Sequence, residues 1–307
     1  MSSEGGLDQT PFMVSGGPAP GSLGGGDRRS HVLGGGRAVV VSTVSTIVFF
    51  GLIAAAFLFA PGSAQVRQEF FNLHDMKVAL VGDPSHGVFS VGEAFLRNIE
   101  MFLIGEVLIL ALALLIAVVR QLRGPVFFPL RLVAIAYTDF FRGVPLILVI
   151  YTIGFGIPAL GLRVVSTQSA EVYGLAALVL SYSAYVSEVY RAGIESVHES
   201  QTAAARSLGL SQWQALRFVV LPQAVRRVIP PLLNDFISLQ KDTALVAILG
   251  TVIEANRAAQ IYSSYAFNYS SFVLAALMFL VLTVPLARFT DHLIARDRRR
   301  RQAGGGR

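Results

Sequence analysis

The sequence predicts an all-α protein: a polytopic membrane bundle of about six transmembrane helices, each needing about 20 apolar residues to cross the hydrocarbon core. The composition is the first reason, because 53% of the 307 residues are hydrophobic and only 14% are charged. A soluble domain carries about 25% charged residues. Second, the chain contains several long apolar stretches with few or no charges. Third, its basic residues gather beside these stretches, as they do in proteins oriented in a membrane.

The first apolar stretch, residues 38–60, carries no charge and is predicted to be an extra N-terminal transmembrane helix. Residues 1–37 before it are rich in Gly, Ser and Pro, so they cannot bury a core and are predicted to be a disordered cytoplasmic tail. This tail is too long and polar for a cleaved signal, so the first span is expected to stay in the mature chain. Residues 61–94 are mixed in character and are predicted to form an extracytoplasmic loop.

Five further spans follow, and two of them carry features that suggest how they begin or pack. Glu106 is the single acid of the second span and is expected to face the bundle interior. Pro230 and Pro231 are expected to start the fifth span, since proline is favoured at helix N-termini. Residues 129–142 are predicted to form a helix that lies partly at the membrane interface, before the third span. The five predicted spans are 99–119, 143–162, 172–194, 228–253 and 269–287.

The basic residues also predict the orientation, because cytoplasmic segments carry an excess of Lys and Arg. Four segments are rich in Arg: those before the first span, between the second and third, between the fourth and fifth, and after the sixth. With six spans, all four lie on one side. Both termini are therefore predicted to be cytoplasmic, in a multi-pass protein of the cell membrane. The net charge of +6 is explained by these segments, so membrane lipid rather than nucleic acid is the predicted contact.

The segment between the fourth and fifth spans, residues 201–222, is predicted to be two short helices joined by a turn. Gly209 is suited to end the first helix, since Gly takes the left-handed conformation at little cost. Ser211 and Gln214 form a capping box for the second helix. Pro222 is expected to stop that second helix. A folded segment of this kind between spans suggests a docking element.

This segment resembles the loop of ABC importer permeases that has the pattern EAA, three residues, Gly, nine residues, Ile-x-Leu-Pro. Both spacings are kept, although Ala203 stands where the family usually has Glu. The resemblance implies that the loop couples the permease to an ATPase, whereas the alternative is an ordinary cytoplasmic loop with helical content. The residues that carry the resemblance are Ala203, Ala204, Ala205, Gly209, Val219, Leu221 and Pro222.

Three other stretches resemble the polar amino-acid branch of these permeases. They are Tyr-Thr-Asp-Phe-Phe-Arg-Gly-Val-Pro-Leu at 137–146, Ala-Tyr-Val-Ser-Glu-Val-Tyr-Arg-Ala-Gly-Ile at 184–194, and the stretch from Pro-Gln-Ala to Lys-Asp-Thr-Ala-Leu at 222–245. In the second stretch, Glu188 and Arg191 are three residues apart and should meet on one helix face. The alternatives are an arginine anchor with a proline kink in the first stretch, and a purely local ion pair in the second. The resemblance covers residues 95–295, the predicted permease domain, and residues 296–307 are a predicted basic cytoplasmic tail.

Within the fifth predicted span, Asn234, Ser238 and Lys241 recur at helical spacing, with an aspartate beside two of them. Charges inside a span are costly and usually face a cavity, a partner or each other. Two interpretations stay open: the stripe lines the translocation path or the subunit seam, or Lys241 and an aspartate neutralise each other. The residues predicted for the path or seam are Asp139, Arg142, Glu188, Asn234, Lys241 and Asp242.

No residue constellation favours an enzyme. The chain has no Walker A motif to cradle ATP. It has no Cys, and its five His are scattered, so no catalytic residues, metal or cofactor are predicted. ATP would be bound by partner ATPase subunits.

The resemblance implies a permease subunit of an ABC importer for polar amino acids, glutamate- or glutamine-like. It also implies three partners: cytoplasmic ABC ATPase subunits, a second permease subunit in a homo- or heterodimer, and an extracytoplasmic substrate-binding protein. The alternatives are a permease for basic amino acids and a stand-alone secondary transporter. A secondary transporter would usually show inverted repeats, and none is evident in the sequence.

Overall fold

The computed structural model describes residues 36–122 and 124–304, and the chain divides into two compact units, Met1–Ser63 and Ala64–Arg307. Most of the predicted tail 1–37 lies outside the described residues. In the first unit, α1 (Gly36–Phe59) is the predicted first helix. Its part Ala38–Phe59 has no buried residue and is apolar all round, which suits a helix surrounded by lipid.

Residues 61–94 contain two helices where the sequence predicts a loop: α2 (Ser63–Phe70) and α3 (Leu73–Val81). The side chain of Asn72 caps α3 by accepting from the backbone N–H groups of His74 and Asp75. The Asn72 N–H donates to Ser270 Oγ at 2.9 Å. This segment therefore has fixed structure because it is capped locally and bonded to a distant part of the chain, a link that its mixed composition does not reveal.

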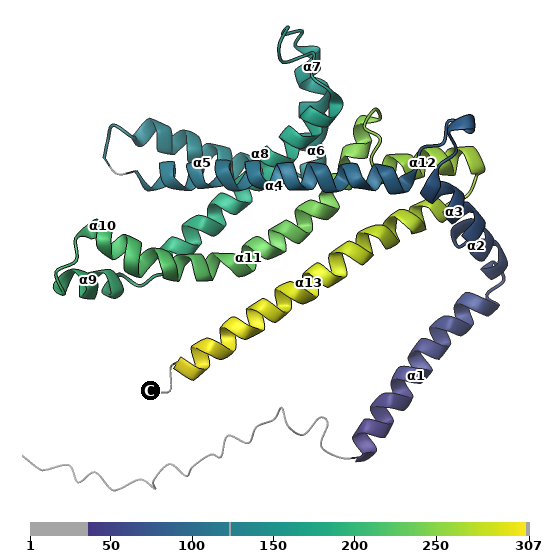
Figure 1. Ribbon diagram of the computed structural model, residues 1–307, viewed down its shortest axis with the longest axis horizontal. Coiled ribbons are helices and arrows are strands. Elements are labelled where there is room, and N and C mark those ends of the chain that lie inside the picture. The colour runs from purple at the N-terminus through teal and green to yellow at the C-terminus, as the bar shows by residue number, and fades with distance from the viewer. Residues whose placement is uncertain (1–35, 123, 305–307) are drawn as a thin grey trace, which may run out of the picture. The chain divides into compact units, whose positions relative to one another are not determined.

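The core of the second unit is built by α4 (Val91–Gln121) and α8 (Ala170–Glu195), which correspond to the predicted second and fourth spans (Figure 1). Both helices carry small residues where they meet their neighbours. Gly174 packs so closely on Val246 that a β-carbon there would overlap its side chain. The largest buried cluster centres on Ile109, Ile150, Leu178, Leu239 and Val246.

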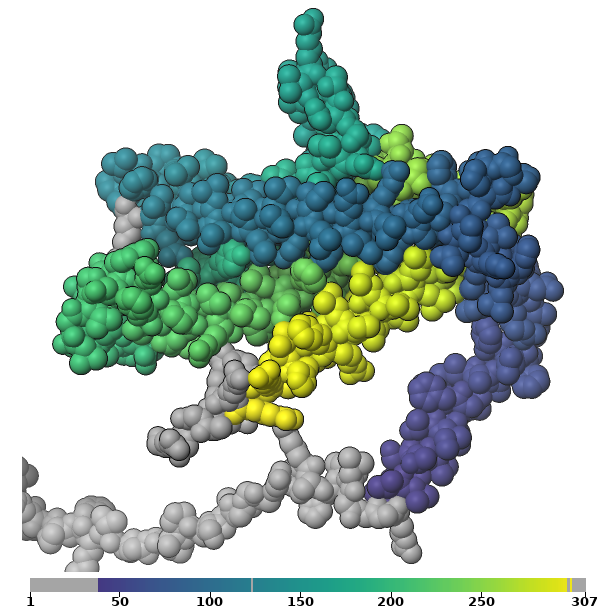
Figure 2. All heavy atoms as spheres, viewed as in Figure 1, coloured from purple at the N-terminus to yellow at the C-terminus, as the bar shows by residue number. Residues whose placement is uncertain are grey.

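The predicted third span is broken. It comprises α6 (Leu146–Tyr151), the π-helical turn η2 (Thr152–Gly156) and α7 (Ile157–Ala159), and the predicted interface helix before it is α5 (Phe128–Gly143). The chain bends by 110° between Phe128–Gly143 and Leu146–Ala159. The bend lies at Gly143–Pro145, as expected from a glycine followed by a proline. In Figure 2 the α6–α7 part (teal) projects from the rest of this unit.

The predicted fifth span is α11 (Leu221–Asp242), followed by the 3-10 helix η4 (Thr243–Leu249). Pro230 and Pro231 lie inside α11, so the prediction that they start this helix is wrong. Proline fixes φ near the helical value and disrupts a helix mainly by removing backbone hydrogen bonds. Here α11 continues through the pair and packs against α8, where Gly193 lies close to Val228.

The last two helices are α12 (Ala255–Ala266) and α13 (Ser270–Gly304). The helix α13 contains the predicted sixth span and continues into the predicted basic tail. Among the described residues, four helices are long and apolar enough to cross a membrane, or up to five if the bent pair counts as one span. The helix α11 is not one of these four, because its sequence contains too many charged residues. The predicted fold class, a polytopic bundle of membrane helices, is confirmed.

Candidate functional site

Residues 199–220, here called the α9–α10 segment, join α8 to α11. They form α9 (Glu199–Ser207), α10 (Gln212–Ala215) and the π-helical turn η3 (Leu216–Val220). In Figure 1, α9 and α10 lie together at one end of the second unit, away from α3 and α12. The predicted pair of short helices is therefore present.

The turn between these helices is built around Gly209, whose φ is 88°. The Gly209 N–H donates to the carbonyl of Arg206 at 3.0 Å, and the Leu210 N–H donates to the carbonyl of Ala205 at 3.2 Å. These two bonds form a Schellman motif, which satisfies the last carbonyls of a helix and requires a left-handed residue at the position of Gly209. The predicted turn and its conformation are confirmed.

The second short helix begins with the predicted capping box. The Ser211 N–H donates to Gln214 Oε1 at 2.8 Å, and the Gln214 N–H donates to Ser211 Oγ at 3.2 Å. The reciprocal pair fixes the direction in which α10 leaves the turn.

Pro222 does not stop this helix, so that prediction is wrong. The chain passes without a break from α10 through η3 into α11, and Pro222 lies in the first turn of α11. Proline has no N–H for the carbonyl four residues earlier. The wider π-helical turn just before it changes the hydrogen-bond register, and the helix axis continues.

The residues predicted for the coupling loop divide into a buried and an exposed set. Ala205 is buried, whereas Ala203, Ala204, Gly209, Leu221 and Pro222 are exposed. Several large apolar side chains of the segment are also exposed, including Leu208 at 82%, Trp213 at 67% and Phe218 at 62%. Exposed apolar side chains that gather in one patch mark a site of contact with another protein or with the membrane. The sequence alone does not reveal that Trp213 and Phe218 are exposed, because exposure depends on how the two short helices fold together.

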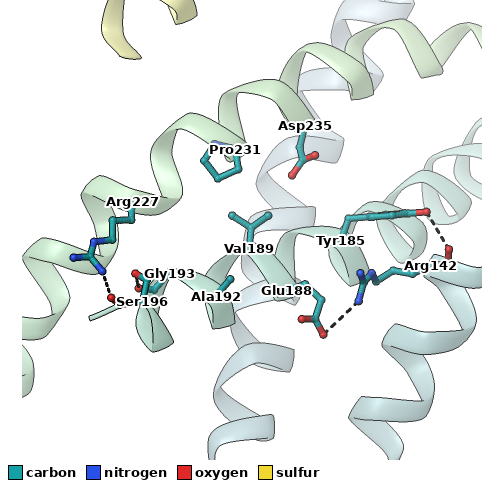
Figure 3. A pocket seen from close by; sticks show the side chains of 10 residues that line it. All are labelled: Arg142, Tyr185, Glu188, Val189, Ala192, Gly193, Ser196, Arg227, Pro231 and Asp235. Carbon is teal, nitrogen blue, oxygen red and sulfur yellow. Dashed lines mark hydrogen bonds and ion pairs between the residues drawn. The ribbon is translucent and has the colours of Figure 1, made fainter. Parts of the chain in front are cut away.

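A second group of predicted residues meets around Glu188 on α8 (Figure 3). Glu188 Oε2 accepts from Arg191 Nη2 at 2.7 Å, which confirms the predicted contact of these two residues. Glu188 Oε1 accepts from Arg120 Nη1, and Arg142 Nη1 lies 3.6 Å from the same oxygen. Arg120, Arg142 and Arg191 with Glu188 are here called the Glu188 cluster. The sequence did not show that Arg120 belongs to it, because 68 positions separate it from Glu188.

A cavity of about 450 Å³ opens beside the Glu188 cluster, between α8 and α11 (Figure 3). Two predicted residues, Arg142 and Glu188, line it together with Asp235. Oδ2 of Asp235 is buried and has no hydrogen-bond partner among the described residues. The remaining lining residues are Tyr185, Val189, Ala192, Gly193, Ser196, Arg227 and Pro231.

The other predicted path or seam residues do not line this cavity. Asn234, Lys241 and Asp139 are exposed on the surface of the single chain. Asp242 accepts a hydrogen bond from Tyr182 Oη at 2.6 Å. Among the residues that the structure describes, no Asp or Glu oxygen lies within 4.0 Å of the Lys241 ammonium. The alternative that an aspartate neutralises Lys241 within the chain therefore finds no contact to support it.

Within residues 36–122 and 124–304, no set of three or more His, Asp and Glu side chains comes together in a way that could hold a metal ion.

Known proteins share this architecture. The model of the family described as "Binding-protein-dependent transport system inner membrane component" matches residues 111–299. The "Probable glutamine ABC transporter permease protein GlnM" of Bacillus subtilis (strain 168) is 36% identical over 192 residues, which are 62% of this chain and 87% of that protein. The "Probable glutamine ABC transporter permease protein GlnP" of the same organism is 34% identical over 209 residues, 67% of this chain and 92% of that protein.

A solved structure described as "an amino acid ABC transporter with histidines" matches with a TM-score of 0.61 and 29% identity, over 67% of this chain and 93% of that one. The matched family model covers more than half of the chain and contains the α9–α10 segment, the Glu188 cluster and the cavity. The resemblance noted in the sequence is confirmed: this chain belongs to the family of binding-protein-dependent transport system inner membrane components.

Proposed function

We propose that this chain is the permease subunit of an ABC importer that carries polar amino acids, glutamine- or glutamate-like, across the cell membrane. The similar proteins are named as glutamine permeases and as an amino acid ABC transporter, which supports the substrate class. The observation that carries the proposal is the α9–α10 segment, a folded element with exposed apolar side chains in a family of transport subunits.

Cytoplasmic ATPases dock on the α9–α10 segment. Trp213, Phe218 and Leu208 offer the kind of aromatic and apolar anchors that form the centre of protein interfaces. The ATPases bind and hydrolyse ATP, and the permease forms no covalent bond. Since the segment continues without a break into α11, movement of an ATPase is transmitted directly to a helix that lines the cavity.

A second permease subunit, identical or homologous, packs against the exposed polar face of α11. Lys241 and Asn234 lie on this face and have no covering element in the single chain. A binding protein delivers the substrate from outside. Transport follows from alternating access, because the partners bind the two states of the permease with different affinities.

The test is reconstitution with the ATPase and binding protein from the same source. Nanodiscs carrying all subunits are expected to hydrolyse ATP faster with the binding protein and L-glutamine than without, and proteoliposomes to accumulate labelled L-glutamine. L-Glutamate and L-arginine in parallel distinguish the acidic and basic alternatives. Uptake by the permease alone, without ATPases, would support the stand-alone secondary transporter instead.

Lys241→Ala is expected to lower uptake by about tenfold, which corresponds to about 1.4 kcal/mol on the transport barrier. Lys241 is exposed and unpaired in the single chain, so its removal leaves no buried group without a partner. The amount of protein in the membrane should stay unchanged. Lys77→Ala, at another exposed lysine, is the matched control. If Lys241→Ala fails to accumulate in the membrane while Lys77→Ala accumulates normally, the residue is structural and the seam assignment is wrong.

The proposed orientation has both termini in the cytoplasm, and the absence of Cys makes it directly testable. Single variants Gln201→Cys and Arg299→Cys should react only with a thiol reagent that reaches the cytoplasm. Ser85→Cys and Ser263→Cys should react with an impermeant reagent added outside intact cells. Protection of position 85 from the outside reagent, combined with reaction from the cytoplasm, would contradict the six-span arrangement.

A further inference from the structure

We propose that Glu188 is a positioning residue that joins α4, α5 and α8 near the α9–α10 segment. Of its three arginine partners, Arg142 is the one that separates from Glu188 in the transport cycle. The inference rests on the proposed function, because it concerns how the motion of the ATPases reaches the cavity. Its evidence is the unequal geometry of the Glu188 cluster.

The three arginines hold Glu188 differently. The side chain of Arg120 is only 13% exposed, and its Nη1 donates to Oε1 and also to Thr138 Oγ1 at 3.2 Å. Arg191 donates to Oε2 through Nε at 2.9 Å and through Nη2 at 2.7 Å. Arg142 is 42% exposed, and its nearest nitrogen is 3.6 Å from Oε1. Arg142 is therefore the loosest and most accessible member of the cluster.

The charges allow Arg142 to leave. Glu188 and its neighbour Glu195, which accepts from Arg191 at 2.5 Å, supply two carboxylates for three guanidinium groups. When Arg142 moves away, Glu188 keeps Arg120 and Arg191, so no buried carboxylate loses its compensation. Loss of Arg120 is different, because both members of that pair are mostly buried and a partner left behind in such a site is costly.

The C-terminal end of α8, which carries Glu188, is fixed to α11 and leads into the α9–α10 segment. Arg227 of α11 donates to the carbonyl of Ser196. Gly193 lies so close to Val228 that a β-carbon would overlap the valine side chain. The helix α9 begins three residues after Ser196. A push on the α9–α10 segment therefore displaces the end of α8 and the start of α11 together.

Arg142 lies on the other side of the contact. It is in the last turn of α5, directly before the 110° bend that leads into α6. The cavity beside it is lined by both Arg142 and Glu188 and gives the arginine room to move. The contact between Arg142 and Glu188 therefore connects the moving ends of α8 and α11 to the bent helix, and it holds the arrangement described here until the ATPases act.

The experiment compares Arg142→Ala, Arg142→Lys, Arg97→Ala and Arg120→Ala in the reconstituted importer with wild type. The matched control is Arg97, which pairs with Glu171 at 3.0 Å where both side chains are exposed, at the opposite ends of α4 and α8. In Arg142→Ala, the ratio of ATP hydrolysis with L-glutamine-loaded binding protein to basal hydrolysis should fall about fivefold or more, the usual size of a coupling effect. Basal hydrolysis should rise, while recovery of the complex and the KM for ATP stay unchanged.

Arg142→Lys should keep most of the stimulation of ATP hydrolysis. A single contact at 3.6 Å needs a positive charge and does not need the planar guanidinium group of arginine. Arg97→Ala should behave as wild type. Wild-type stimulation in Arg142→Ala would overturn the proposal. So would a loss of assembled complex equal to that of Arg120→Ala, since Arg142 would then be merely structural. If the wild-type complex itself shows no stimulated hydrolysis, the proposed function fails and this inference fails with it, a result distinct from a failure confined to Arg142.

Discussion

Glu254→Ala is expected to destabilise the protein by about 3 kcal/mol, since each buried polar group left without a partner costs about 1–3 kcal/mol. Glu254 is fully buried and caps α12 by accepting from the backbone N–H groups of Asn256 at 2.9 Å and Arg257 at 2.8 Å. It also accepts from Asn98 Nδ2 at 3.0 Å, and Asn98 Oδ1 in turn accepts from the Ala255 N–H. Alanine leaves the N–H groups of Asn256 and Arg257 without this acceptor, while Asn98 Nδ2 keeps only its bond to Thr243 Oγ1 at 3.0 Å.

The measurement is thermal unfolding in detergent, where this loss should lower the Tm by about 6 °C or more for a chain of this size. Glu254→Gln keeps an acceptor oxygen and should cost less. Glu171→Ala is the matched control, because that carboxylate sits in an exposed ion pair worth at most about 1 kcal/mol. Equal Tm values for Glu254→Ala and Glu171→Ala would show that the buried network contributes nothing.

Gly209→Asp is expected to reduce recovery of the ATPase with the permease by about tenfold, the result of losing roughly 1.4 kcal/mol of binding free energy. The φ of 88° at Gly209 is unfavourable for any residue with a β-carbon. No atom lies within 4 Å of the position that a β-carbon would take, so the substitution causes no clash inside the chain. The effect falls instead on the turn between α9 and α10 and on the partner that covers it.

Gly87→Asp provides the control, since Gly87 also has a positive φ, of 68°, and also has free space around it. It follows the short 3-10 helix Pro84–His86, away from the α9–α10 segment. Both variants should reach the membrane in wild-type amounts. Co-purification and substrate-stimulated ATP hydrolysis are then measured on both. If Gly209→Asp retains the ATPase as well as Gly87→Asp does, the α9–α10 segment is not the docking element.

The sequence predicted those features that depend on neighbouring residues. The turn at Gly209, the capping box of Ser211 and Gln214, and the contact of Glu188 with Arg191 all join residues within one or two helical turns. Their geometry follows from local backbone rules, which hold whatever surrounds them.

Features that depend on distant residues could not be predicted in this way. Arg120 and Arg142 reach Glu188 from other helices, and Asn98 meets Glu254 across 156 positions. The predictions for the prolines are wrong for the same reason. Pro222 and Pro230 are local signals for a helix start or stop, but a π-helical turn and packing against α8 outweigh them here.

The charges of α11 have a consequence for how the chain enters the membrane during synthesis. Each Arg, Lys or Asp at the centre of a helix costs about 2.5–3.5 kcal/mol on insertion into lipid, and α11 carries Asp235 within it and Lys241 and Asp242 near its end. These costs disfavour the entry of α11 into the bilayer as an isolated helix. In the folded chain, the hydroxyl of Tyr182 donates a hydrogen bond to Asp242, and Gly193 allows Val228 to pack closely. Both residues belong to α8, which is synthesised before α11. We therefore expect α8 to insert first and to provide a protein surface against which α11 packs as it enters the membrane.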